Sequence, residues 1–314
     1  MEPKVKAGRE VIMTVAETIR EITKKHLQSG GVALGQCLTA VGWVGGTVPE
    51  LTEQDGLIEL SMDDTAGGGI AVGLALAGRR PIYIVRYQGF QWFNAAMIVN
   101  YAAKSKDMWG IPCPVFVRSV AMEGSIGPVA SSSHHGMFTR MPGIEVVAPM
   151  TPAEYVSTWE YFMDHDVPIY VSEHRRSFPI NYELPNIIRS KADITLFPIS
   201  VGRLNALEAV KELEKEGIMC NLIHIVRLKP FVPSDYMLRA LANSIHGGIV
   251  IDTDFENGVS KCIAHDMMLA SDKKVCILGL KERAAGFAPH LDNLPPSPKE
   301  IIIKVKELLK DNRQ

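Results

Sequence analysis

The sequence predicts an α/β protein with two tandem domains whose sheets are mainly parallel. Short apolar strands alternate with helical stretches from end to end, a pattern typical of parallel sheets covered by helices. The alternation is interrupted once, near residue 180, and then restarts. At roughly 150 residues per domain, the 314 residues also favour two domains. We therefore expect one domain over residues 1–180 and another over residues 190–314.

The first half begins with a helix over about 9–26, where apolar residues such as Val15, Ile19 and Ile22 recur at helical spacing. Thr151 and Pro152 suit the N-cap and first position of a later helix. Further helices are expected at the glycine run after Asp64 and near 90–104. Short apolar runs predict six strands, at 31–35, 57–60, 81–85, 114–117, 144–147 and 167–171.

Residues 174–190 lose this periodicity and contain Arg175, Arg176, Pro179 and Pro185, so we expect a linker there. The alternation then resumes in the second half. It predicts strands at 194–197, 220–225, 249–251 and 275–278, and helices at about 203–216, 257–270 and 298–310.

Composition excludes several classes of protein. The net charge of −2 argues against a nucleic-acid binder, which needs a basic surface. The longest unbroken stretch of small and apolar residues, 67–78, is too short and too rich in glycine for a membrane span. Five widely spaced cysteines without a Cys-x-x-Cys pair predict reduced thiols. Because the N-terminus also lacks a secretory pattern, we expect a cytoplasmic protein.

The densest candidate site is Asp63-Asp64 followed by Gly67-Gly68-Gly69. Two carboxylates end a strand just before a glycine run that opens a helix. Ligands of parallel sheets bind at the carboxyl ends of strands, and the N-terminus of a helix offers free amide donors. The alternative is a purely structural arrangement, with an aspartate as helix cap and glycines that allow close packing.

Two further stretches are candidates. The loop that contains His134 and His135 after three serines could supply a general acid or base, bind an anion or a metal, or be a solvated loop. The aromatic run from Tyr87 through Phe90 to Phe93 is either a platform for a flat ring or part of the core. No complete phosphate loop or hydrolase elbow is present.

Several stretches together form a specific ordered set. They are 35–51, Asp63-Asp64, GIAVGLALAGRRP (69–81), NYAAK (100–104), Gly127-Pro128, PGIEVVAP (142–149) and RLKP (227–230). With this set the chain resembles the beta subunit of the pyruvate dehydrogenase-type 2-oxo acid dehydrogenases and, more broadly, the C-terminal half of transketolases. The resemblance covers nearly the whole chain. It implies a pyrimidine-binding domain followed by a transketolase C-terminal-like domain.

The resemblance implies thiamine diphosphate as cofactor and a site shared between subunits. In this superfamily a Gly-Asp-Gly motif holds the diphosphate through Mg²⁺, and this chain lacks that motif. It would therefore bind the aminopyrimidine half, with no metal ligand of its own, while an alpha-type subunit holds Mg²⁺. The implied assembly is a heterotetramer. The implied reaction is decarboxylation or two-carbon or acyl transfer from a 2-oxo acid or ketose, by an oxidoreductase or a transferase.

Residue by residue, the resemblance places Asp64 where the family has the glutamate that hydrogen-bonds ring nitrogen N1′. Tyr87 and Phe90 match aromatic positions beside the ring. Gln36 replaces an acidic residue, and Ala130 replaces a histidine.

His134 and His135 are the predicted catalytic substitutes for the missing histidine, and Arg118 and Arg140 are candidate contacts of an anionic substrate. Because three polar positions differ from the family, two alternatives stay open: a split transketolase C-terminal subunit, or a non-catalytic assembly or regulatory subunit. A dinucleotide-dependent oxidoreductase is a third alternative, but the sequence has no fingerprint for one.

Overall fold

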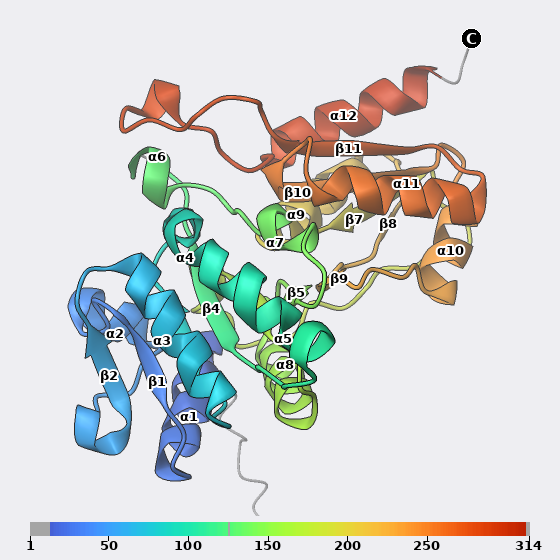
Figure 1. The fold of residues 1–314 in the computed structure, drawn as a ribbon. Coiled ribbons are helices and arrows are strands. Elements are labelled where there is room, and N and C mark those ends of the chain that lie inside the picture. The colour runs from blue at the N-terminus through green and yellow to red at the C-terminus, as the bar shows by residue number, and fades with distance from the viewer. Residues whose placement is uncertain (1–12, 125, 312–314) are drawn as a thin grey trace, which may run out of the picture.

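The computed structural model describes residues 13–124 and 126–311, which form two β-sheets with helices on both faces (Figure 1). The first sheet has the strand order β2-β1-β3-β4-β6-β5-β9, and the second has the order β11-β10-β7-β8. Every strand pair is parallel except β5 with β9. The predicted α/β class with mainly parallel sheets is confirmed.

The first half supplies the six predicted strands; β2 has the predicted bounds, and the ends of the other five are shifted. The strands are β1 (Ala33–Gln36), β2 (Leu57–Leu60), β3 (Ile82–Val85), β4 (Phe116–Ala121), β5 (Glu145–Val147) and β6 (Ile169–His174). The longer helices are α1 (Val15–Gln28), α3 (Asp64–Leu76), α4 (Gln91–Met97), α5 (Ala103–Trp109) and α8 (Pro152–Asp164). The short ones are α2 (Ala40–Gly46), α6 (Gly127–Ala130) and α7 (Gly136–Thr139). Residues 9–12, the start of the predicted first helix, lie outside the described residues.

The expected helix near 90–104 is divided into α4 and α5 by a π-helical segment, Ile98–Ala102. The predicted cap of α8 is confirmed, because the Thr151 side chain accepts a hydrogen bond from the Glu154 amide. Alternate residues of a strand point to opposite faces of the sheet. In β3, Ile82 and Ile84 therefore join the core under α1 and α8, and Tyr83 and Val85 join the core under α3.

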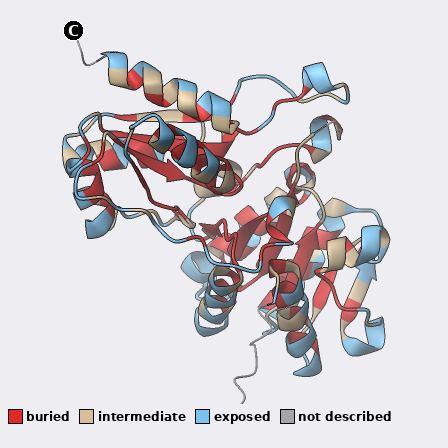
Figure 2. Ribbon diagram, turned by 180° about the vertical axis from the view of Figure 1, so that it is seen from behind, coloured by how far each residue is buried: buried red, intermediate tan, exposed pale blue. Residues whose placement is uncertain are grey.

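The second half builds the smaller sheet. Its strands are β7 (Ile194–Pro198), β8 (Cys220–Leu222), β10 (Gly248–Phe255) and β11 (Val275–Leu280). Its helices are α9 (Gly202–Lys215), α10 (Asp235–Ala242), α11 (Val259–Ser271) and α12 (Pro298–Asp311). Apolar residues of α9 and α12 cover one face of this sheet, and those of α10 and α11 cover the other. Both sheets are buried along most of their length (Figure 2).

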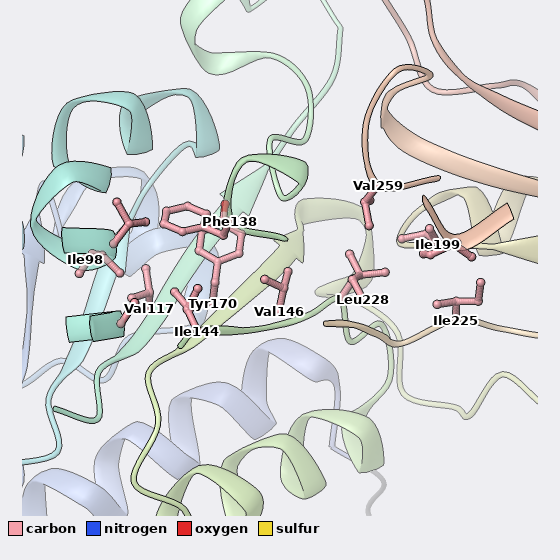
Figure 3. Close-up of a cluster of buried hydrophobic side chains, with 14 of the residues drawn as sticks. Ile98, Val117, Phe138, Ile144, Val146, Tyr170, Ile199, Ile225, Leu228 and Val259 are labelled. Atoms are coloured by element: carbon pink, nitrogen blue, oxygen red, sulfur yellow. The ribbon is translucent and has the colours of Figure 1, made fainter. Parts of the chain in front are cut away.

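The two halves are joined by more than a linker. Strand β9 (Arg227–Lys229) belongs to the second half of the chain but pairs antiparallel with β5 of the first sheet. One hydrophobic cluster combines Val146 and Tyr170 of the first sheet with Ile199 and Val259 of the second half (Figure 3). The segment predicted as a linker is irregular, but it is anchored by buried residues, among them Phe178, Ile180 and Leu184. The boundaries 1–180 and 190–314 stay a prediction.

Within the described residues, no helix combines the length and apolar character that crossing a membrane requires.

Candidate functional site

The carboxyl ends of β1 and β3 and the start of α3 surround a cavity of about 150 Å³. This is the edge of a parallel sheet at which ligands bind. All four predicted cofactor contacts line the cavity, which is formed by Gln36, Cys37, Met62, Asp64, Tyr83, Ile84, Val85, Arg86, Tyr87 and Phe90. The structure thus brings together residues that lie more than fifty positions apart in the sequence. We call this space the ring cavity.

Asp64 is held in the ring cavity by the N-terminus of α3. Asp63 is the N-cap, and its side chain accepts a hydrogen bond from the Ala66 amide. Asp64 is therefore the first helical residue. Gly67 allows the helix to lie close to the sheet. A Cβ added at this position would be only 2.9 Å from the Tyr83 hydroxyl oxygen. The helix-cap interpretation and the ligand-site interpretation of this motif are thus compatible, because Asp63 caps α3 and Asp64 faces the ring cavity.

The environment of Asp64 favours its protonated form. Partial burial raises the pKa of its carboxyl, the neighbouring charge of Asp63 raises it further, and a hydrogen bond to its own backbone opposes this only in part. A carboxyl whose pKa is raised can keep a proton to donate. Asp64 can therefore donate a hydrogen bond to a basic ring nitrogen.

The walls of the ring cavity suit a flat ring. The rings of Tyr87 and Phe90 lie 5.9 Å apart and are tilted by 46°. The side-chain nitrogen of Gln36 is buried, and no described residue forms a hydrogen bond to it. Apolar walls with a few placed polar groups are typical of cofactor sites. An aminopyrimidine, which has both hydrogen-bond acceptors and an amino group, fits this set of residues.

A left-handed turn follows β1 beside the ring cavity. Five consecutive residues, from Val41 to Gly45, have φ between 52° and 67°. Such a conformation costs roughly 1–2 kcal/mol for each residue other than glycine. In the segment between β1 and this turn, the Leu38 and Thr39 amides donate hydrogen bonds to the Glu59 carboxylate. The sequence pattern did not predict this turn, and only its glycines hint at it.

The structure does not bring His134 and His135 to the ring cavity. His134 lines a separate cleft between the two domains. His135 is fully buried, with its Nε2 2.9 Å from an oxygen of Asp252 and its Nδ1 3.1 Å from the Ser172 hydroxyl. With both nitrogens engaged, His135 has no free position for a substrate. The predicted substitution for the missing family histidine therefore has no support in the geometry.

The two candidate substrate arginines also lie elsewhere. Arg118 is buried and forms a two-pronged ion pair with Glu173, at 2.7 and 3.0 Å, as well as a hydrogen bond to Thr47. The prediction that Arg118 contacts substrate is wrong, because its charge is already neutralised in the core. Arg140 is exposed on the rim of the interdomain cleft.

Two other arginines flank the ring cavity, and the sequence pattern did not predict them as site residues. Arg86 lines the cavity itself, and Arg175 shares a small neighbouring cavity with Arg86 and Tyr87. Both are half-buried. Among the described residues neither guanidinium has an ion-pair partner, whereas Arg176 beside them pairs with Glu123. These two arginines thus present uncompensated positive charge beside the cavity.

Comparison with known proteins identifies the domain that builds the ring cavity. Residues 32–181 match the family described as the transketolase pyrimidine-binding domain. This match covers a little under half of the 314 residues. The predicted resemblance is confirmed, and the ring cavity lies entirely within the matched residues.

Curated proteins similar to this chain include several beta subunits. The chain is 28% identical over 287 residues to the pyruvate dehydrogenase E1 component subunit beta of Rickettsia felis, covering 82% of this chain and 86% of the relative. It is 26% identical over 283 residues to the acetoin:2,6-dichlorophenolindophenol oxidoreductase subunit beta of Cupriavidus necator, covering 82% of both chains. It is also 26% identical to the 2-oxoisovalerate dehydrogenase subunit beta of Bacillus subtilis, covering 77% of this chain and 80% of the relative.

Solved structures support the same fold. A split-gene transketolase, described as an inactive beta4 tetramer, has a TM-score of 0.69 at 14% identity and covers 95% of this chain and 98% of its own. A transketolase variant from Pichia stipitis has a TM-score of 0.71 at 17% identity, with 96% of this chain and 47% of its own covered. This chain therefore corresponds to about half of a full-length transketolase.

In residues 13–124 and 126–311, no group of three or more histidine, cysteine, aspartate or glutamate side chains is arranged so that it could hold a metal ion.

Proposed function

We propose that this chain is the beta-type subunit of a two-subunit, thiamine diphosphate-dependent enzyme that acts on a 2-oxo acid. The observation that carries the proposal is the ring cavity, in which Asp64, Gln36, Tyr87 and Phe90 meet at the end of a parallel sheet. The relatives named as beta subunits of oxidoreductases support the same conclusion.

Each residue of the ring cavity has a defined task in this proposal. Thiamine diphosphate, when bound, supplies the carbon nucleophile that attacks the substrate carbonyl. Tyr87 and Phe90 form the aromatic wall against which the aminopyrimidine would pack, and the Gln36 amide would hydrogen-bond its polar edge. Asp64 holds a proton at ring nitrogen N1′. Because the aspartate side chain is one methylene shorter than glutamate, this contact requires α3 to approach the ring closely.

The ring cavity is only half of a cofactor site in this proposal. An alpha-type subunit brings the diphosphate-binding motif and Mg²⁺, and the complete assembly is a heterotetramer. Large apolar side chains beside the ring cavity support a subunit contact, since Met62 is 81% exposed, Phe93 56% and Ile70 44%. Clusters of exposed apolar residues commonly mark interfaces. All five cysteines are free, as expected for a complex in the reducing cytoplasm.

The substrate class follows from the unpaired arginines. Leaving a half-buried guanidinium without a counter-ion is unfavourable, so Arg86 and Arg175 favour a negatively charged substrate. A 2-oxo acid carries a carboxylate next to the reacting carbonyl. Arginine binds carboxylates in a two-pronged geometry. We therefore assign the carboxylate end of the substrate to these two side chains.

The decisive experiment measures turnover in the complex of this chain with its alpha-type partner. We expect Asp64→Asn to lower turnover by at least about 100-fold, in line with the loss of a positioned proton donor. Asp64→Glu should retain measurable turnover because it keeps the carboxyl. Asp107→Asn, which changes an exposed carboxylate on α5, is the matched control and should leave turnover unchanged.

Two results would contradict the proposal. Wild-type turnover in the Asp64→Asn complex would favour a non-catalytic assembly subunit. Tight binding of thiamine diphosphate and Mg²⁺ by the isolated chain would contradict the half-site arrangement.

A further inference from the structure

A second cavity lies between the two domains and is separate from the ring cavity. Its volume is about 340 Å³, and it is lined by Trp92, His134, Gly136, Met137, Arg140, Met141, Asp254, Phe255, Asn257 and Gly258. It has no lining residue in common with the ring cavity. Its walls come from α4, from α7 with the loop before it, and from the junction of β10 and α11. We call it the interdomain cleft.

The lining of the interdomain cleft carries buried negative charge. The Asp254 side chain is only 5% exposed, and its oxygens accept hydrogen bonds from the Gly136 and Phe255 amides, each at 2.7 Å. Behind it, Asp252 is fully buried, and one of its oxygens has no hydrogen-bond partner among the described residues. The His135 imidazole lies 2.9 Å from Asp252 and 4.0 Å from Asp254. One imidazole therefore faces two carboxyl groups.

The positive groups of the lining do not balance this charge. Burial lowers the pKa of His134 despite the attraction of Asp254, so His134 offers a neutral ring. Arg140 is exposed on the rim, where water screens its charge. Burial raises the pKa of Asp254, whereas His135 and the hydrogen bonds from the Gly136 and Phe255 amides lower it. A cation bound beside Asp254 would stabilise its charged form.

Aromatic rings surround the same space. The Trp92 indole is 62% exposed, and its centroid lies 6.1 Å from that of His134. The centroid of the Phe255 ring lies 6.4 Å from that of His134. Rings of this kind attract cations through their negative faces, and Met137 and Met141 add adaptable apolar surface. The cleft thus combines a buried carboxylate with aromatic and thioether walls.

We propose that the interdomain cleft is a binding site for a small organic cation, an amine or ammonium compound with an apolar or aromatic body. The ammonium group lies against Asp254, and the body packs between Trp92 and Phe255. A cleft of about 340 Å³ is at the lower end of the range for small-molecule sites. The ligand would contact both domains at once. This site is independent of the proposed cofactor chemistry.

The test is a calorimetric titration of the full chain with three probes of one shape, namely benzylammonium, benzyl alcohol and benzoate. We expect benzylammonium to bind at least ten times more tightly than the other two and to change tryptophan fluorescence. Asp254→Asn and Trp92→Ala should each weaken its binding at least tenfold. Asp272→Asn, an exposed aspartate at the end of α11, is the matched control and should bind like the wild type.

Other outcomes would overturn this proposal. Preferential binding of benzoate would mean an anion site formed by Arg140 and the N-terminus of α11. Absence of benzylammonium binding, or unchanged binding in Asp254→Asn, would equally exclude the cation site. Because Trp92 is largely exposed, its variant should fold even if replacing the buried Asp254 destabilises the chain, and thermal unfolding of both variants reveals such a difference.

Discussion

At the scale of single residues, the proton affinity of Asp64 is set by its neighbours. Partial burial and the charge of Asp63 both raise the pKa of Asp64. The same Asp63 side chain caps α3. Asparagine caps helices about as well as aspartate, so the charge of Asp63 can be removed while the cap is kept.

We therefore predict that Asp63→Asn shifts the pH profile of the assembled enzyme. Loss of the neighbouring negative charge lowers the pKa of Asp64, so its protonated form disappears at a lower pH. The alkaline limb of turnover against pH should move toward lower pH, while the free energy of unfolding changes by less than about 0.5 kcal/mol. Steady-state kinetics over a pH series measures the shift. An unmoved alkaline limb would mean that Asp64 does not control it.

Residue positions in the ring cavity were predictable, and those of the histidines were not. Asp64 and Tyr87 follow strand ends, and the carboxyl ends of parallel strands meet at one edge of the sheet. The direction of His135 depends instead on Asp252, which lies 117 positions further along the chain. Arg118 similarly finds Glu173 on the neighbouring strand β6. Local sequence patterns contain no information about such distant partners.

At the scale of secondary-structure elements, two glycines occupy opposite backbone environments. Gly42 lies in the left-handed turn with φ of 61°, and Gly73 lies inside the right-handed helix α3. A Cβ added at either position would meet no atom within 4 Å. The backbone conformation alone therefore decides the effect of an alanine.

We predict opposite effects of Gly42→Ala and Gly73→Ala on stability. Alanine should destabilise the left-handed turn by about 1 kcal/mol. In the helix it should stabilise by roughly 0.5–1 kcal/mol, because glycine loses more conformational freedom on folding. Urea unfolding of the isolated chain measures both changes, and each variant serves as the control for the other. Equal effects of the same sign would show that Val41 to Gly45 do not keep this turn in solution.

Elements with a strong apolar pattern were predicted, and weakly patterned ones were missed. Most predicted strands are runs of apolar residues that are buried in a sheet, as in β3 and β7. Strand β9 contains Arg227 and Lys229 around a single buried Leu228, so it lacks such a run and forms only because β5 offers a free edge. Helix α10 has eight residues, which is too short for helical periodicity to stand out.

At the scale of the whole molecule, the two domains are joined by polar contacts in addition to the shared hydrophobic core. Arg203 of α9 is fully buried and binds both oxygens of Glu154 in α8, at 2.6 and 2.7 Å. His135 of the first domain contacts Asp252 of β10 at 2.9 Å. These contacts, together with strand β9 in the first sheet, predict that the two domains unfold together.

The buried pair of His135 and Asp252 should make this joint stability depend on pH. Burial alone lowers the pKa of His135, but attraction to Asp252 and Asp254 and the hydrogen bond to Asp252 outweigh it, so the pKa lies above the usual 6.5. Because the pKa of His135 is raised in the folded state, the charged pair contributes fully to the free energy of unfolding at pH values below the pKa of this histidine in the unfolded chain. The contribution is lost as the pH rises through the higher pKa of the folded state. The raised pKa of Asp254 acts in the same direction, whereas the neighbouring His134, whose pKa is lowered, opposes it at acidic pH.

We therefore predict that His135→Asn removes much of the decline in stability that occurs as the pH rises above the ordinary histidine pKa of 6.5. At about pH 6 it should cost roughly 3–5 kcal/mol, because Asp252 is left buried without its cation. Urea unfolding at several pH values measures both effects. His265→Asn, which changes an exposed histidine, should leave the pH dependence as in the wild type. A full wild-type decline in His135→Asn would mean that the pair is not the group that titrates, and separate unfolding of the two domains would mean that it does not join them.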